Sequence, residues 1–211
     1  MAGLHELLAE LDGAEAATIA PRLLGGVVSV VGADGALVRL RLTEVEAYGG
    51  AGVDPGAHSF RGPTRRNATM FGPPGRLYVY FTYGMHVCAN IVVGAEGVGT
   101  GVLLRAGEVV EGLEAARARR LGARDDSELA RGPARLTRAL GIVLGDDGAR
   151  IGQVPPDRFG FEAAPVPPQR IANGPRTGVS GPGGSDAFPW RFWLVGDPTV
   201  SPYRAHRPRA R

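Results

Sequence analysis

The stretch ALVRLRLTEVEAYGGAGVDPGAHSFRG, residues 36–62, decides the fold of this chain, because a strand pattern breaks there into a glycine-rich loop. Hydrophobic and polar residues alternate over 36–48, which predicts a long β-strand with one apolar face. The preceding VVSVVG segment and its ADG turn, residues 27–35, make this strand the second one of a predicted hairpin. Glu46 is in phase with the leucines of the strand, on the mainly apolar face, where burying a carboxylate is costly unless it has a use.

The end of this strand brings a carboxylate, a phenol and, a few residues later, an imidazole close together in sequence: Glu46, Tyr48 and His58. A strand gives rigid support and the loop after it gives access, a combination typical of binding and catalytic sites. A carboxylate beside a flat ring favours a pocket that stacks a planar ligand and performs acid–base chemistry on it. The spacing alone also allows a structural interpretation, in which an Arg satisfies a buried Glu, the Tyr lies in the core and the His caps the loop.

The same pattern signals predict the remaining elements. Helices are expected at 13–24 (interrupted near Pro21), 63–75, 111–122 and 132–142, and strands at 76–84, 86–94, 100–109 and 191–196. Successive strands joined by short connections favour an antiparallel sheet. Since no repeat or linker divides the chain, we expect one α+β domain over residues 1–211, with loosely ordered ends at 1–12 and 204–211.

The bulk composition is that of a soluble globular protein, with 44% hydrophobic residues and a mean hydropathy of −0.04. No apolar run approaches the ~20 residues that span a bilayer. The N-terminus lacks the basic start and apolar stretch of a signal peptide, so we expect a cytoplasmic location. The single cysteine, Cys88, excludes an internal disulfide, and the four scattered histidines form no metal-ligand pattern. We therefore expect no metal and no cofactor.

The charge balance favours a polyanionic partner only mildly, because the net charge is +3 and the pI is about 9.5. Every one of the 24 basic residues is Arg. A GC-rich genome explains this bias as well as any function does. The chemical consequence is independent of the cause: no side-chain amine can form a Schiff base, so an imine mechanism would need the α-amino terminus.

The stretch LYVYFTYGMHVCAN, residues 77–90, contains a second group of aromatic side chains. Tyr78 and Tyr80 share one face of a strand, whereas Tyr83 falls at the turn, where no core receives it. A bulky side chain there is either an exposed accident or a wedge that helps to take a nucleotide out of a duplex. Asn90 is unusual inside a strand. Its amide either hydrogen-bonds the edge of a planar heterocycle or pins a loop.

An arginine lies at the end of the apolar strand VLLRAGE. Arg105 needs an anionic partner at such a position, and Glu46 is the natural candidate. Further arginines gather in the loops and helix starts around the predicted strands. They are either solvated or in contact with phosphates; they are Arg61, Arg65, Arg66, Arg76 and Arg131.

The motifs in this order resemble those of the alkyladenine (3-methyladenine) DNA glycosylase family, the human-type enzyme and its bacterial relatives. The resemblance extends from about residue 15 to residue 203, is weakest over 145–185, and is carried by EVEAY, AHS, RN.TMFGPPGRLYVYFTYGMHVCANI, GVLLRA.E, ARGP..L..ALGI and RFWLVGDPTVS. It implies a mainly antiparallel, curved β-sheet flanked by helices, with a protruding β-hairpin that carries a DNA wedge. It also implies hydrolysis of the N-glycosidic bond of alkylated or deaminated purines in duplex DNA, such as 3-methyladenine, 7-methylguanine, hypoxanthine and ethenoadenine.

The matched motifs carry residue roles. Glu46 matches the glutamate that activates the attacking water, and Arg105 matches the arginine that helps to hold it. Tyr48, Tyr80 and His58 match the groups that sandwich the flipped base.

The recognition of the base edge and of the duplex also follows from the resemblance. Asn90 matches the asparagine that reads the purine edge and disfavours a guanine amino group, and Thr177 is the nearest match to a main-chain carbonyl that touches the water. Tyr83 matches the wedge, with Met85 and His86 beside it. The expected phosphate contacts are Arg61, Arg65, Arg66 and Arg131.

The chain departs from the mammalian pattern in two places. The loop between Glu46 and His58 differs in length and composition, which affects His58 as a pocket wall. His86 stands where the mammalian enzyme has an aromatic residue beside the wedge.

The expected partner is duplex DNA that contains damaged purines, bound by a monomer that associates with the nucleoid through DNA. Two other classes of function use the same residues differently. A DNA- or RNA-binding module without catalysis would not need a buried Glu46, and a hydrolase of free nucleosides would have no reason for an aromatic residue at a hairpin tip.

Overall fold

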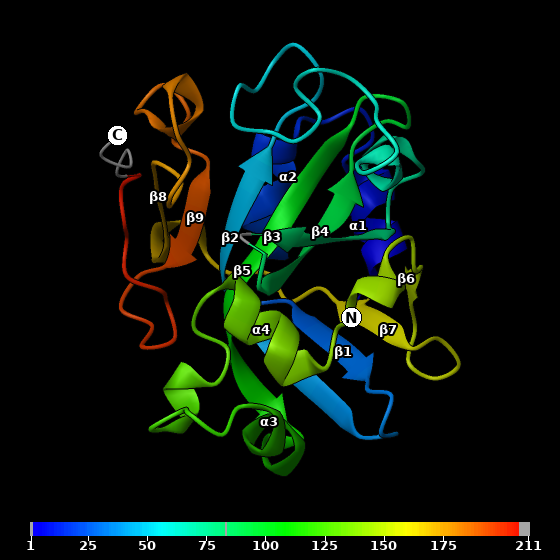
Figure 1. Ribbon diagram of the computed structural model, residues 1–211, viewed down its shortest axis with the longest axis vertical. Helices are drawn as coiled ribbons and strands as arrows, with labels where there is room; N and C mark the ends of the chain where they lie inside the picture. Colours follow the sequence, from blue (N-terminus) through cyan, green and yellow to red (C-terminus); the bar gives the residue numbers. More distant parts are fainter. Residues whose placement is uncertain (1, 83, 207–211) are drawn as a thin grey trace.

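The computed structural model describes residues 2–82 and 84–206, which form a single α+β domain with a curled sheet (Figure 1). Within these residues the α-helices are α1 (Leu4–Glu10), α2 (Ala16–Leu23), α3 (Leu113–Arg119) and α4 (Pro133–Leu140). The strands are β1 (Val27–Val31), β2 (Leu37–Tyr48), β3 (Leu77–Thr82), β4 (His86–Val93), β5 (Thr100–Glu111), β6 (Ile151–Gly152), β7 (Phe159–Glu162), β8 (Ile171–Gly174) and β9 (Arg191–Leu194).

The strands form one sheet in the order β3-β4-β5-β2-β1-β7-β6, and β9 pairs with both β2 and β8. Every pairing is antiparallel except that of β6 with β7. This confirms the mainly antiparallel α+β fold that the sequence predicts. The predicted hairpin β3–β4 is present. Its predicted role as a DNA wedge stays a prediction, because Tyr83 lies outside the described residues.

Strand β2 is the centre of the sheet. It pairs with β5 along most of its length, with β1 through its first half, and with β9 over Glu44–Glu46 in its second half. The pairing with β5 is irregular around Glu44. This is where β2 exchanges β1 for β9 as its other neighbour, so the second half of β2 is enclosed on both edges.

One row of side chains crosses four strands on a single face of the sheet. In the antiparallel ladders Glu46 is opposite Leu103, Leu103 is opposite Asn90, and Asn90 is opposite Tyr78. Directly opposed residues share a face of the sheet. Val45, which alternates with the two glutamates of β2, belongs to the hydrophobic core on the other face.

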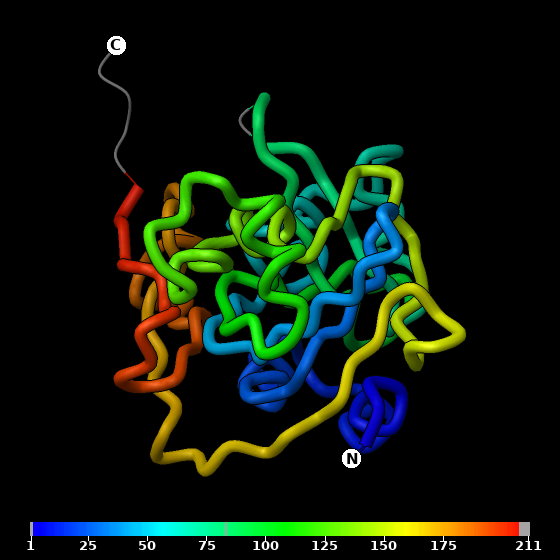
Figure 2. The backbone as a smooth tube through the Cα atoms, turned by 90° about the horizontal axis from the view of Figure 1, so that it is seen from below, coloured from blue at the N-terminus to red at the C-terminus, as the bar shows by residue number. Residues whose placement is uncertain are grey.

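Figure 2 shows α1 and α2 on one side of the molecule and the β3–β4 hairpin and α4 on the opposite side. Helix α2 packs on β2 and contributes buried Ile19 and Leu23 to the core. Helix α4 packs against β4 and β5 with its buried Leu136 and Leu140. The site described below lies on the side of the hairpin and α4.

Three expectations about local structure are corrected. Within the expected loose end at 1–12, residues 4–10 form α1, because Leu4 and Leu7 are three positions apart and bury one face of the helix in the core. Helix α2 runs through Pro21 without interruption. The helix expected at 63–75 is only a single 3-10 turn, Ala68–Phe71. The region 145–185 also contains three short strands, β6, β7 and β8, which its Gly- and Pro-rich sequence does not predict.

Among the described helices, none is long and apolar enough to cross a membrane.

Candidate active site

A cavity of about 370 Å³ lies on the face of the sheet that carries Glu46. Its walls come from β2, β3, β4 and β5, the start of α4, the loop around His58, and the segment 177–180. Every residue predicted for catalysis or for the base pocket lines it: Glu46, Arg105, Tyr48, His58, Tyr80, Asn90 and Thr177. A larger groove of about 1300 Å³ lies elsewhere, between α1 and the β6–β7 edge, and contains none of these groups.

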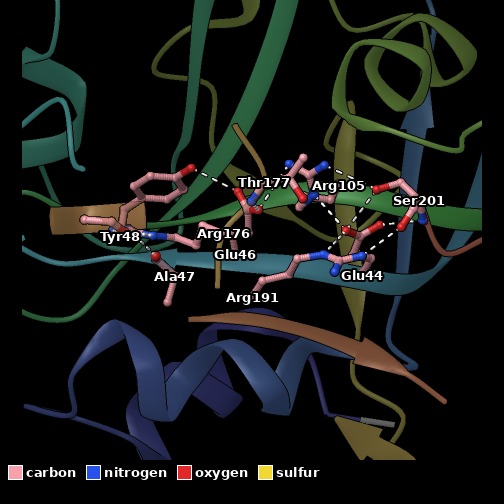
Figure 3. Close-up of polar contacts among 10 residues, drawn as sticks. Glu44, Glu46, Ala47, Tyr48, Arg105, Arg176, Thr177, Arg191 and Ser201 are labelled. Carbon is pink, nitrogen blue, oxygen red and sulfur yellow. Dashed lines mark hydrogen bonds and ion pairs between the residues drawn. The ribbon is translucent and has the colours of Figure 1, made fainter. Parts of the chain in front are cut away.

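Glu46 is fully buried and surrounded by donors (Figure 3). Its Oε1 accepts the backbone N–H of Thr177 at 2.7 Å and lies 3.2 Å from Nη1 of Arg105. Its Oε2 accepts the hydroxyl of Tyr48 at 2.9 Å. The predicted pairing of Glu46 with Arg105 is thus present, although Arg105 has a second carboxylate partner.

That second partner is Glu44, which is also fully buried. Nε of Arg105 donates to Oε1 of Glu44 at 2.8 Å, and Nε of Arg191 donates to the same oxygen at 2.6 Å. The backbone N–H of Ser201 donates to Oε2 at 2.7 Å. Burial alone would raise the pKa of Glu44, but the charges of Arg105 and Arg191 and the hydrogen bonds together lower it. Glu44 therefore remains ionised, and its hydrogen bond with Arg105 holds this guanidinium next to Glu46.

Arg105 consequently keeps its charge. Burial would lower its pKa, but the two carboxylates outweigh burial and raise it. A permanently charged guanidinium thus links Glu44 to Glu46 within the sheet.

A second buried ion pair, absent from the sequence prediction, supports the loop after β2. Arg176 and Asp54 are both fully buried, and Arg176 donates to the two carboxylate oxygens at 2.6 Å each. Arg176 also donates to the carbonyl of Ala47 at 2.9 Å. Asp54 accepts the backbone N–H of Gly49 at 3.0 Å. The pair therefore fastens residues 47–54 to the segment that ends at Thr177.

Tyr48 is held from two directions. The guanidinium carbon of Arg176 lies 4.5 Å from the centre of its ring, a cation–π contact. Its hydroxyl donates to Glu46. Burial, followed by the charge of Glu46, raises the pKa of Tyr48 well above that of a free phenol, so the hydroxyl remains a donor.

Tyr80 and His58 form a second aromatic wall of the cavity. Their rings are 4.7 Å apart and nearly perpendicular, and Tyr80 is stacked on Tyr78 at 5.2 Å. Nδ1 of His58 lies 3.2 Å from the Tyr78 hydroxyl. Burial, together with the positive charge of Arg66, lowers the pKa of His58, so the imidazole is neutral at pH 7. Burial raises the pKa of Tyr78 to about 12.

Two polar atoms of the cavity lack a partner. Among the described residues, Oδ1 of Asn90 and Oγ1 of Thr177 are the buried side-chain atoms without a hydrogen bond. Buried polar atoms are nearly always paired, so an unpaired one in a cavity points to a missing ligand or water. Cys88 also lines the cavity, and burial raises the pKa of its thiol to about 11, which leaves it unreactive.

The residues predicted to contact DNA surround this cavity only in part. His86 lines it, and Met85 is 68% exposed beside the hairpin turn. Arg66 is exposed and donates to the carbonyl of Phe81 in β3 at 2.8 Å, and Arg61 and Arg65 are exposed in the same loop. Arg131 is different, because it is half-buried and its Nε donates to the carbonyl of Val200. Tyr83 lies outside the described residues.

No group of three or more His, Cys, Asp or Glu side chains in residues 2–82 and 84–206 could hold a metal ion. The cavity combines a buried carboxylate, aromatic walls and unpaired polar atoms, which suits acid–base chemistry on a flat, polar-edged ligand.

Comparison with known proteins gives one consistent result. The methylpurine-DNA glycosylase family model matches residues 10–198. A protein of Leifsonia xyli subsp. xyli named as a 3-methyladenine DNA glycosylase is 59% identical over 192 residues, 89% of this chain and 88% of its own length. Proteins with the same name in Streptomyces avermitilis and Nocardia farcinica are 57% and 51% identical, each over 92% of this chain and 89% of their own length.

The buried pair Arg176–Asp54 yields a stability prediction. Asp54→Asn leaves a buried guanidinium without its counter-charge, so we expect the free energy of unfolding to fall by about 3–5 kcal/mol. The control is Asp126→Asn, which removes the partner of Arg117 in a solvent-exposed pair and is expected to have little effect. Denaturant unfolding measures both. Equal, small changes in the two variants would mean that the pair does not hold the loop.

Proposed function

The chain belongs to the methylpurine-DNA glycosylase family and is a DNA glycosylase, a hydrolase of N-glycosyl bonds in base-excision repair; from this premise we propose its substrates and its mechanism. The proposed substrates are alkylated and deaminated purines, of the 3-methyladenine, 7-methylguanine, hypoxanthine and ethenoadenine class, in duplex DNA. The damaged nucleotide leaves the stack, enters the cavity, and loses its base to water activated by Glu46. The product is an abasic site.

The single observation that carries the proposal is the coordination of Glu46. The carboxylate is fully buried, yet it lines the cavity. Its Oε1 accepts the N–H of Thr177 and forms an ion pair with Arg105, whereas its Oε2 accepts only the Tyr48 hydroxyl among the described residues. A carboxylate oxygen can accept two hydrogen bonds, so Oε2 retains a place for one donor from the cavity side. A water molecule is the natural occupant.

The chemistry follows from this arrangement. An alkylated purine is electron-poor, so the bond from C1′ to its nitrogen breaks with the electron pair leaving on the base. Positive charge then develops on the sugar, and the fixed carboxylate stabilises it. The water adds its oxygen to C1′ and passes a proton to Glu46. Positioned base catalysis of this kind contributes roughly 10²–10⁴-fold.

The aromatic walls account for capture of the base. Extrusion of a nucleotide costs a few kcal/mol, least when the base is damaged or mispaired. Stacking returns roughly 1–3 kcal/mol for each base–aromatic contact. Tyr48, fixed by Arg176 and Glu46, forms one wall in this proposal, and Tyr80 with His58 forms the other.

The unpaired polar atoms face the base edge in this proposal. Asn90 lies in the same cross-strand row as Glu46, on the face of the sheet that lines the cavity. Its orphaned Oδ1 is available to read the purine edge, and Thr177 supplies a second unpaired group beside the carboxylate. A site whose buried polar groups must be satisfied rejects ligands that leave them unpaired.

Delivery of the base is assigned to the β3–β4 hairpin. Its side chains Phe81 and Met85 are 45% and 68% exposed, which leaves them available to a duplex. Tyr83, between them in sequence, is the proposed wedge, and the exposed Arg61, Arg65 and Arg66 are the proposed phosphate contacts. Each step needs one copy of the chain, so the proposed acting species is a monomer.

Substitution of the proposed base tests the mechanism. Glu46→Gln keeps the size of the side chain but cannot take a proton, so we expect single-turnover base release to fall at least ~100-fold while duplex affinity changes little. The control Glu96→Gln removes an exposed carboxylate and should keep the parental rate. Near-parental base release by the Glu46 variant would remove the role assigned to this residue.

Substitution at the hairpin turn tests delivery. We expect Tyr83→Ala to weaken capture of the flipped nucleotide, seen as lower affinity and slower base release on duplex DNA, because the gap in the stack is no longer filled. Thermal unfolding should be unaffected. The control Tyr203→Ala shortens a tyrosine that is exposed. If the two variants excise bases with the kinetics of the parent, the wedge hypothesis is wrong.

A further inference from the structure

Three arginines lie together on α4, whose first residues line the cavity, and at the end of α3, and they have no role in the mechanism above. Arg135 and Arg138 are exposed on α4, and Arg120 lies at the end of α3. We call these three residues the α4 arginine surface. Helices α3 and α4 pack against each other, which brings the third residue to the first two.

The orientation of α4 fixes where these side chains point. The buried residues of the helix are Leu136, Thr137, Ala139 and Leu140. Arg135 and Arg138 are three positions apart and therefore occupy one face, the exposed one. Because the opposite face of α4 packs in the core, both arginines point to solvent from fixed positions on the helix.

The electrostatics of this surface are unfavourable in the protein alone. Burial, followed by the charges of Arg135 and Arg138, lowers the pKa of Arg120 against the opposing charge of Glu128, and Nε of Arg120 donates to the carbonyl of Leu129. Among the residues that the structure describes, none of the three forms an ion pair. The neighbouring arginines differ, because Arg117 pairs with Asp126 at 2.7 Å and Arg124 pairs with Glu128 at 3.2 Å.

The position of the α4 arginine surface relative to the cavity indicates which partner it could bind. Pro133 and Ala134, at the start of α4, line the cavity, and Arg135, the next residue in sequence, is exposed. Figure 2 shows α4 on the same side of the molecule as the β3–β4 hairpin. A duplex that delivers a nucleotide to the cavity has to pass along this side of the molecule. Its phosphates are negatively charged and can pair with the three guanidiniums, which have no ion-pair partner among the described residues.

We propose that the α4 arginine surface binds the phosphate backbone of the duplex next to the extruded nucleotide, on the flank opposite the loop that carries Arg61, Arg65 and Arg66. The proposal rests on the proposed function, because it assumes that the cavity receives a nucleotide from a duplex. Phosphate contacts position the duplex and carry no sequence information. The surface thus accounts for affinity and not for the choice of lesion.

The test compares two double variants that lose the same charge. Arg135→Gln with Arg138→Gln removes two members of the α4 arginine surface. Arg22→Gln with Arg117→Gln removes two arginines that are already paired, with Glu10 and Asp126, and Arg22 lies on α2 on the far side of the molecule. All four side chains are exposed or nearly so, and thermal unfolding checks that both doubles remain folded.

The readout is affinity for a duplex with one hypoxanthine, measured over a range of salt concentrations. For the α4 double we expect the slope of log K against log salt to become shallower by about 1.8, since each lost phosphate contact accounts for about 0.9. Single-turnover base release at saturating DNA should stay within about twofold of the parent. The control double should keep the parental slope.

An unchanged slope in the α4 double, or an equal change in both doubles, would overturn the inference. The proposed function fails in a different way. A parent protein that binds the duplex but releases no base would contradict the function, whereas a shallower slope in the α4 double alone would still support the surface.

Discussion

A guanidinium held between two carboxylates is the interaction on which the site depends. Arg105 contacts both Glu44 and Glu46, and all three side chains are at most 7% exposed. An isolated buried charge is too costly to keep. Arg191 and the pair Arg176–Asp54 complete a set of three arginines and three carboxylates, so the buried charge is balanced. The cavity can therefore contain a carboxylate that is available for chemistry without a net charge in the protein interior.

The sheet explains why this network has a defined geometry. Cross-strand pairing places Tyr78, Asn90, Leu103 and Glu46 in one row, so the floor of the pocket that carries Glu46 and Asn90 is built on strands. Hydrogen bonds attach the loop to the end of β2: Asp54 accepts the backbone N–H of Gly49, and Arg176 donates to the carbonyl of Ala47. The strands hold Glu46, and the Arg176–Asp54 pair keeps the segments that carry Tyr48 and Thr177 beside it. The exposed hairpin and α4 lie on the same side, where a duplex can reach the cavity.

Local patterns in the sequence predicted the parts of the fold that have local causes. Alternation located β2 through β5, and the glycine after β2 located the strand-to-loop junction that carries the site. Predictions were wrong where a tertiary contact decides, as in α1, which is ordered because the core receives Leu4 and Leu7. In the site, the pairing of Glu46 with Arg105 was predicted from chemistry. The pair Asp54–Arg176 was missed, because the two residues are 122 positions apart in sequence and no periodic pattern connects them.

The central claim is that the carboxylate of this cavity directs water, and not an amine, to the sugar of a damaged purine nucleotide. Incubation with duplex oligonucleotides that carry a single 3-methyladenine, hypoxanthine or ethenoadenine, followed by alkali, tests it most directly. A glycosylase without a lysine is expected to leave abasic sites, so the strand should break only after alkali. Breakage without alkali, or release of bases only from free nucleosides, would contradict the account.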